Sequence, residues 1–315
     1  MKWMKSAAIC MCAGLLAANC LHAQVKGKRP AITGLSHVVV LNDDLDASSK
    51  FYAGLVGWPA TPALEDGDAV HYQVGAQQYI EVKKAPGPKD PVDRLDHIAF
   101  ITADVKAMRE YLGLNGVAVP AKVTVRKDGG SSFMVTDPEG YAIEFVQGGK
   151  FPPTSTDAVS TRLMHVGFSV RNEALESHFY IDLLGFRLYW EGWNKDEGHK
   201  DGVYDYKSLQ VPDGTDWVEF MLSLGRNQQP GQPWMRDPHH FAPGVVSIED
   251  SFALLQKRGL ADRNEPRSKP QLGRDGKMQL NLFDPNGLRV ELMGFKPVQD
   301  PCCYQFTGPQ PSPER

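Results

Sequence analysis

The sequence predicts an α+β protein assembled from four copies of one βαβββ module. Three observations predict this fold class. An apolar strand that carries a histidine occurs four times, an amphipathic helix follows each of these strands, and a later strand in each copy carries a glutamate. Repeats of this length indicate one supersecondary unit used several times. The 315 residues are enough for two domains of ordinary size.

The opening strand of each module is a short apolar run around a histidine. Successive histidines lie 60, 68 and 75 residues apart. The fourth run holds two, His239 and His240, and we favour His240 because the next helix then starts eight residues later, as it does in the second module. The four predicted strand histidines are His37, His97, His165 and His240.

An amphipathic helix follows each opening strand. Its apolar residues recur in steps of three, four and seven, which places them on one face against a sheet. A glycine lies where each helix should stop. The apolar positions are Leu45, Phe51, Tyr52 and Leu55; Val105, Met108 and Leu112; Leu175, Phe179 and Leu183; Ile248, Phe252 and Leu255.

Each module closes on a strand with a glutamate, 44 to 54 residues after its histidine. Neighbouring residues of a strand point to opposite faces. The flanking apolar residues should therefore face the helices, which leaves the histidines and glutamates together on the other face. The four glutamates are Glu81, Glu144, Glu219 and Glu291.

The chain ends differ from the modules. Residues 1–23 combine Lys2 and Lys5 with a short apolar stretch and Leu21-His22-Ala23, which is typical of a cleaved signal peptide and predicts export to the periplasm or the medium. We expect no transmembrane segment once it is removed. Residues 150–160 are predicted to be a linker, and residues 297–315 an irregular tail.

Composition narrows the classes of partner. Hydrophobic residues make up 42% and charged residues 23%, with a net charge of −4 and no lysine-arginine run, so nucleic acid is not an expected partner. We expect a small-molecule substrate and leave a homodimer open. The mature chain would keep only Cys302 and Cys303, whose disulfide ring would be strained, so the fold should not depend on disulfides.

These histidine and glutamate strands resemble the vicinal-oxygen-chelate superfamily of glyoxalases, bleomycin-resistance proteins and extradiol dioxygenases. The resemblance implies that modules pair into two cupped mixed-sheet domains. We assign residues 32–149 to the first (modules 1 and 2) and residues 161–296 to the second (modules 3 and 4), although pairing of module 1 with module 4 is an alternative.

The resemblance also implies that these residues are metal ligands. A buried carboxylate is costly unless it is paired or binds a metal, and imidazole with carboxylate suits Fe²⁺, Mn²⁺, Zn²⁺ or Ni²⁺. By similarity to extradiol dioxygenases, the second half would bind through His165, His240 and Glu291. The predicted sets are His37, Glu81, His97 and Glu144 in the first half, and His165, Glu219, His240 and Glu291 in the second.

Other residues are predicted to serve the reaction. Glu144 or Glu219 could act as the base that glyoxalase chemistry needs. Extradiol enzymes carry a catalytic tyrosine where this chain has Asn281, which argues against the usual ring-cleavage relay. The expected pocket walls are Trp217, Arg289, Tyr204 and Tyr206.

Three functions remain open from the sequence. The first is a metal-dependent enzyme, a dioxygenase, isomerase or lyase that acts on a small oxygen-rich molecule. The second is a metal-free binding protein of the bleomycin-resistance type, against which the retained ligands count. The third is an exported structural or partner-binding protein whose sites are vestiges of duplication.

Overall fold

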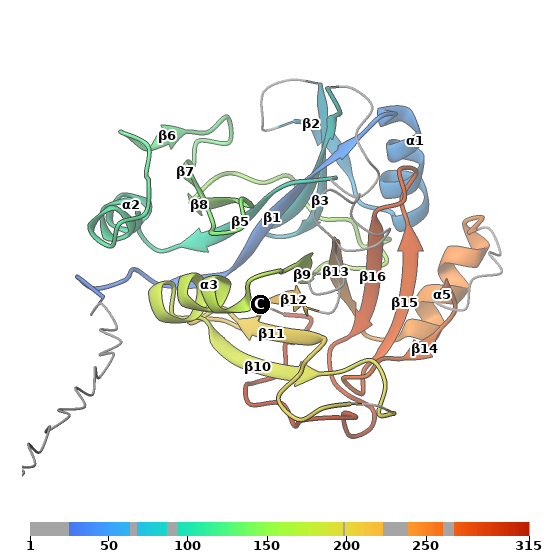
Figure 1. Ribbon diagram of the computed structural model, residues 1–315. Helices are drawn as coiled ribbons and strands as arrows, with labels where there is room; N and C mark the ends of the chain where they lie inside the picture. The colour runs from blue at the N-terminus through green and yellow to red at the C-terminus, as the bar shows by residue number, and fades with distance from the viewer. Residues whose placement is uncertain are drawn as a thin grey trace, which may run out of the picture.

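Two eight-stranded mixed sheets form the protein (Figure 1). The computed structural model describes residues 25–63, 68–86, 94–197, 199–222, 239–260 and 268–314. Residues 1–23, the predicted signal peptide, lie outside the described residues. Within the described part of the chain, no helix is long and apolar enough to span a bilayer.

Modules 1 and 2 share the first sheet, in the order β2-β3-β4-β1-β5-β8-β7-β6. The opening and closing strands of each module pair in parallel, and the two opening strands join the modules antiparallel. The elements are β1 (Ile32–Asn42), α1 (Leu45–Ser49), η1 (Lys50–Val56), β2 (Ala60–Pro62), β3 (Ala69–Gly75), β4 (Gln78–Lys84), β5 (Leu95–Thr102), α2 (Val105–Leu114), β6 (Thr124–Val125), β7 (Ser131–Thr136) and β8 (Ala142–Gln147).

Modules 3 and 4 repeat this arrangement in the order β10-β11-β12-β9-β13-β16-β15-β14. The predicted fold class is therefore confirmed, with module 1 paired to module 2. The elements are β9 (Leu163–Ser169), α3 (Glu173–Ser177), η2 (His178–Leu183), β10 (Arg187–Gly192), β11 (Tyr206–Gln210), β12 (Trp217–Met221), β13 (His240–Val245), α5 (Ile248–Lys257), β14 (Gln271–Leu272), β15 (Met278–Phe283) and β16 (Arg289–Gly294).

Polar side chains cap the N-termini of the helices. Asp44 Oδ1 accepts a hydrogen bond from the Ala47 N–H (2.9 Å), and Ser247 Oγ accepts one from the Asp250 N–H (3.1 Å). The helices of modules 1 and 3 continue into the π-helical segments η1 and η2. These segments place Tyr52 at the same position in module 1 as Tyr180 in module 3.

The alternation along the opening strands separates a dry face from a polar face. Val38 and Val40 on β1 are fully buried in the hydrophobic core that the helices cover. His37, which directly precedes Val38 in the sequence and is also fully buried, points to the opposite face. The same alternation holds on β5 and β9, so the polar face of each sheet receives its histidines.

The two halves contact each other reciprocally. The turn after β15 places Asp284 against the helix of module 1, where Tyr52 Oη donates a hydrogen bond to Oδ2 (3.0 Å). The turn after β7 places Asp137 against the helix of module 3, where Tyr180 Oη donates to Oδ2 (3.2 Å). Each half therefore supplies a turn aspartate that accepts a hydrogen bond from a helix tyrosine of the other half.

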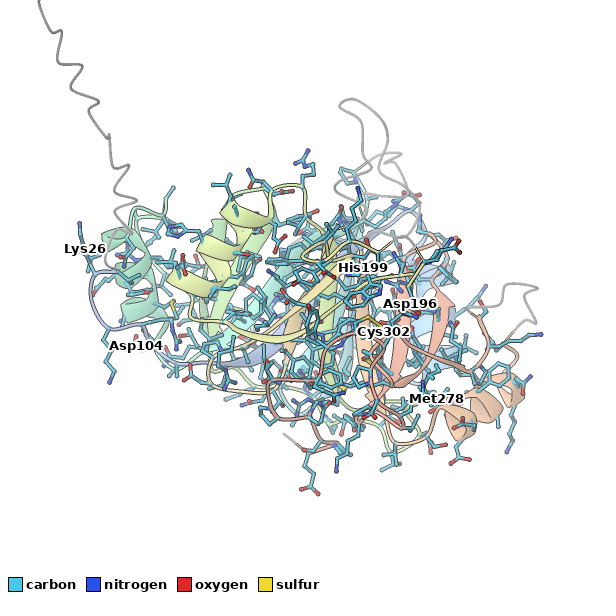
Figure 2. All side chains as sticks on the ribbon, turned by 60° about the horizontal axis from the view of Figure 1, so that its bottom comes forward. Lys26, Asp104, Asp196, His199, Met278 and Cys302 are labelled. Atoms are coloured by element: carbon cyan, nitrogen blue, oxygen red, sulfur yellow. A yellow bond between two sulfur atoms is a disulfide. The ribbon has the colours of Figure 1, made fainter. Side chains whose placement is uncertain are left out.

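Residues 297–314 form an irregular tail on the second half. Thr307 N donates a hydrogen bond to Tyr189 O (3.0 Å), and the Phe306 ring lies 4.8 Å from the Tyr189 ring. Cys302 and Cys303 are joined by a disulfide despite being neighbours. Figure 2 shows Cys302 beside the insertion between β10 and β11.

Candidate metal centres

Three adjacent strands of each sheet present the candidate ligands. In the first sheet β1, β5 and β8 lie side by side, and in the second β9, β13 and β16 do. Each triplet contributes two histidines and one glutamate whose side-chain atoms lie within 4.8 Å of one another. The two groups are His37, His97 and Glu144, and His165, His240 and Glu291.

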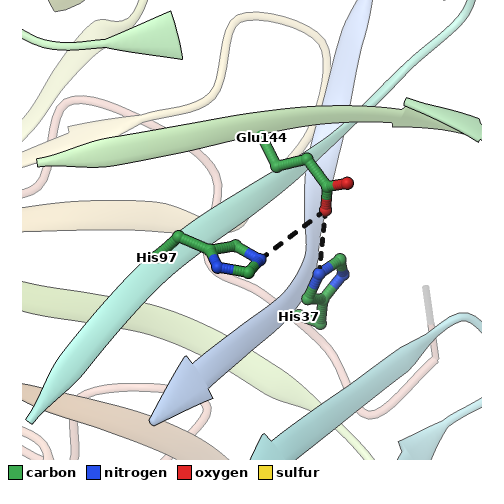
Figure 3. Close-up of side chains that lie close together, drawn as sticks. All are labelled: His37, His97 and Glu144. Atoms are coloured by element: carbon green, nitrogen blue, oxygen red, sulfur yellow. Dashed lines mark ion pairs between the residues drawn. The ribbon is translucent and has the colours of Figure 1, made fainter. Parts of the chain in front are cut away.

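The first triad converges on one carboxylate oxygen (Figure 3). Glu144 Oε2 lies 3.0 Å from His37 Nε2 and 3.8 Å from His97 Nε2. Burial lowers the pKa of His37 to about 4, which keeps the imidazole neutral at pH 7. Burial alone would raise the pKa of Glu144, but its contacts with His37 and Arg126 lower it to about 2. A neutral imidazole and an ionised carboxylate are the forms that bind a metal.

The second triad is more tightly gathered. Glu291 Oε2 lies 3.5 Å from His165 Nε2 and 3.6 Å from His240 Nε2, and the two imidazole nitrogens are 3.0 Å apart. Burial also lowers the pKa of His240. Burial alone would raise the pKa of Glu291, but the positive charge of Arg289 and the contacts with His165 and His240 together hold it well below its usual value. At pH 7 His240 is therefore neutral and Glu291 is ionised.

The remaining two predicted ligands lie beside the triads. Glu81 is on β4, on the other side of β1 from the strands that carry His97 and Glu144, and it is fully buried. Glu219 is on β12, and its Oε2 lies 3.4 Å from His240 Nε2. Burial raises the pKa of Glu219. The structure therefore gathers three of the four predicted ligands of each half and places the fourth one strand away.

His239, the alternative to His240, points away from the triad. Its Nε2 lies 3.1 Å from the Tyr141 hydroxyl of the first half. Burial lowers its pKa to about 4. His239 directly precedes β13, and adjacent residues of an extended chain face opposite sides, which explains the difference.

Three of the four predicted pocket residues lie at the second triad. Trp217 stacks on the His165 ring, with the ring centroids 4.6 Å apart. Tyr206 and Arg289 line a small cavity of about 100 Å³ beside Glu219 and Glu291. Tyr204, in contrast, lies near the tail, with its ring 5.9 Å from that of Tyr304.

Several polar residues at the triads do not belong to the repeated pattern, so the sequence analysis did not identify them. Arg126 NH1 lies 3.2 Å from Glu144 Oε2, and its NH2 donates a hydrogen bond to the Tyr79 hydroxyl. Lys277 is fully buried, 4.7 Å from the centre of the Trp217 ring. Asp96, which accepts a hydrogen bond from His97, could have been found because it directly precedes that histidine.

The donor sets fit a divalent metal ion. Two imidazoles and one carboxylate on three adjacent strands leave coordination positions for other ligands, as in facial-triad sites. A cavity of about 520 Å³ reaches the first triad and is lined by Glu144 and Arg126. The first triad could thus combine a metal with a small bound molecule.

Known structures share this fold at low sequence identity. A Mn(II)-bound glyoxalase from Novosphingobium aromaticivorans is 20% identical over 84% of this chain and 83% of its own, with a TM-score of 0.61. Homoprotocatechuate 2,3-dioxygenase from Arthrobacter globiformis is 20% identical over 91% and 85%, with a TM-score of 0.64. An extradiol ring-cleaving dioxygenase from B. fuscum is 19% identical over 89% and 75%, with a TM-score of 0.60.

Sequence comparison assigns the family directly. No curated protein sequence matches the chain. The model of the Glyoxalase/Bleomycin resistance protein/Dioxygenase superfamily matches twice, at residues 34–145 and 162–292. Each match covers one sheet, its helices and its triad. The chain belongs to the Glyoxalase/Bleomycin resistance protein/Dioxygenase superfamily, with one family domain in each half.

Proposed function

We propose that the protein is an exported, metal-dependent enzyme that acts on a small oxygen-rich molecule. In this proposal the substrate binds the metal through two neighbouring oxygen atoms. The observation that carries the proposal is the pair of buried triads, each with two histidines and one glutamate. Buried imidazoles and carboxylates of this number are costly unless a cation joins them.

The chemistry follows from what the residues can do. A divalent metal held by a triad would act as a Lewis acid on the bound oxygens, which favours negative charge on the substrate. Glu219 is a buried carboxylate whose pKa is raised, so it would suit proton transfer if the second half bound the substrate. Glu144 is a triad member and would serve the first half as ligand or base.

The reaction class is narrowed by Asn281. It lies on β15 opposite Glu291, where the backbones of the two residues pair. An amide cannot exchange a proton as the tyrosine of an extradiol relay does. Proton transfer by a carboxylate, as in isomerases and lyases, is therefore the chemistry that we propose over ring cleavage.

Export is proposed from the N-terminal segment. Lys2 and Lys5 precede an apolar stretch that ends before Ala23. This pattern is typical of a secretory signal. Mass spectrometry of the protein secreted or exported by its host tests the proposal, which predicts a mature N-terminus after residue 23.

Metal-dependent chelation can be tested with simple probes. The mature protein would be loaded with Mn²⁺ and titrated with catechol and with oxalate, which present two neighbouring oxygens, and with phenol and acetate as matched single-oxygen controls. We expect the two-oxygen probes to change the Mn²⁺ EPR spectrum at concentrations where the controls do not.

The same titrations distinguish the alternatives. Calorimetry after EDTA treatment should show that the two-oxygen probes no longer bind. Binding that survives metal removal would favour a metal-free sequestering protein. A mature protein that takes up neither Mn²⁺, Fe²⁺, Zn²⁺ nor Ni²⁺ would refute the proposed function.

A further inference from the structure

The two triads differ in what the outer nitrogen of their histidines faces. In the first triad, His97 Nδ1 lies 2.9 Å from Asp96 Oδ2. An ionised carboxylate only accepts hydrogen bonds, so Nδ1 carries the proton and Nε2 keeps its lone pair for a metal. His37 Nδ1 lies 3.0 Å from Ser36 Oγ, and this hydroxyl can accept a hydrogen bond, which permits the same tautomer. Metal-binding histidines are typically held in this way.

In the second triad the outer nitrogen meets a cation. His240 Nδ1 lies 2.7 Å from Arg289 NH2. A guanidinium only donates hydrogen bonds, so Nδ1 must accept and the proton of the neutral ring moves to Nε2. That proton can be donated to His165 Nε2, which is 3.0 Å away. A protonated Nε2 cannot bind a metal.

The close spacing of the second triad is consequently explained without an ion. A chain of hydrogen bonds runs from Arg289 through His240 to His165. Arg289 NH1 also lies 3.3 Å from Glu291 Oε1, so the guanidinium supplies the positive charge that the buried carboxylate requires.

In the first triad, the nearby arginine contacts the glutamate. Arg126 NH1 lies 3.2 Å from Glu144 Oε2, and Arg126 also contacts Asp128. It competes for one carboxylate oxygen, and it leaves His97 Nε2 as a possible metal ligand, because Asp96 holds the proton on Nδ1. Two residues before Glu144, at the position of Arg289, the first half has Ala142.

The residue that pairs with the triad histidine on the neighbouring strand also differs between the two halves. His240 pairs with Gly167 on β9, whereas His97 pairs with Val39 on β1. A Cβ atom on Gly167 would lie 1.9 Å from His240 Cε1, so the imidazole lies directly over the glycine. A valine, as in the first half, would exclude this position of the ring. The pose that contacts Arg289 is thus built on a residue difference between the halves.

The two triads also differ in the size of the cavity beside them. The cavity at the first triad measures about 520 Å³, whereas the one beside Glu291 measures about 100 Å³. Trp190, which lines the smaller cavity, packs against Phe306 of the tail, with ring centroids 6.4 Å apart. The tail therefore fills space next to the second triad.

We propose that the chain holds one metal ion, at His37, His97 and Glu144, and that the second triad is metal-free, with the Arg289 guanidinium in place of the ion. This assignment rests on the proposed function and deepens it. The substrate would then bind in the first half, next to Arg126, whose guanidinium suits an anionic oxygen-rich molecule.

Metal stoichiometry tests the assignment without an activity assay. The full mature chain and its variants would be incubated with Mn²⁺, passed through gel filtration and measured by elemental analysis and EPR. We expect one ion per chain in the wild type, none in His97→Gln, and one in the matched variant His240→Gln. Arg289→Met should raise the number to two, because it frees His240 Nδ1 and Glu291. Arg289→Gln is the second variant if the methionine protein does not fold by circular dichroism.

Each other outcome has a defined meaning. Two ions in the wild type, or loss of the ion in His240→Gln with retention in His97→Gln, would overturn the assignment and leave the proposed function standing. An arginine variant that folds and stays at one ion would refute the role of Arg289. A wild type that binds no ion would overturn both proposals.

Discussion

Replacing Glu176 with glutamine should remove a stability penalty that grows as the pH rises. Glu176 is fully buried between the two halves, and its Oε1 accepts a hydrogen bond from the Glu139 N–H (2.8 Å). Burial, together with the negative charge of Asp137, raises the pKa of Glu176 to about 9. The carboxyl is therefore protonated in the folded protein at neutral pH and ionised in the unfolded chain.

The direction and size of this pH effect on the free energy of unfolding follow from proton linkage. Between the unfolded value of 4.5 and the folded value of about 9, the folded state binds the extra proton. The free energy of unfolding therefore falls as the pH rises through this range, by at most about 1.4 kcal/mol per pH unit. From pH 5 to pH 7 the loss is at most about 3 kcal/mol, and sharing of the proton with Asp137 makes it smaller.

Urea unfolding of the wild type and Glu176→Gln at pH 5, 7 and 8.5 measures this effect. We expect similar stability at pH 5 and a growing advantage of the variant at higher pH. Glu110→Gln is the matched control, since Glu110 is exposed on α2. Parallel stability curves for the wild type and Glu176→Gln would refute the reasoning.

Three more outcomes are expected. Asp96→Asn should weaken Mn²⁺ binding about 10- to 100-fold, because the histidine that follows it loses its carboxylate partner; unchanged affinity in a Mn²⁺ titration would contradict this. Tyr52→Phe should lower the free energy of unfolding by about 2 kcal/mol, since Asp284 loses a buried hydrogen bond, and urea unfolding checks it. Gly167→Val should displace His240 and destabilise the chain by about 2 kcal/mol or more, visible as a lower thermal midpoint and a shifted imidazole NMR signal.

The repeat made most of the fold predictable. Period-two alternation alone indicated that His37 and Val38 face opposite sides of their strand, and the helix offset favoured His240 over His239. Both follow from local geometry, which a sequence displays directly. The structure has these strands and faces as expected.

The residue pattern by itself could not decide which glutamate joins each triad, and only the family resemblance named Glu291 for the second half. Glu81 and Glu144 have the same local pattern, and each lies on a strand beside one histidine strand, β4 beside β1 and β8 beside β5. The choice depends on side-chain direction and on contacts from elsewhere in the chain, such as that of Arg126 with Glu144, which are tertiary properties. Arg126 and Lys277 were missed for a related reason, since they come from loops and hairpins where no periodic pattern marks a residue.

The reciprocal contacts of Asp284 with Tyr52 and of Asp137 with Tyr180 bear on the origin of the chain. A single half contains both the turn with its aspartate and the helix with its tyrosine. Two copies of such a half could therefore form both contacts with each other about a two-fold axis. Fusion of two such copies would bring that pairing within one polypeptide. Each position could then change independently of its counterpart, as Ser48 and Glu176, which occupy equivalent helix positions, have done.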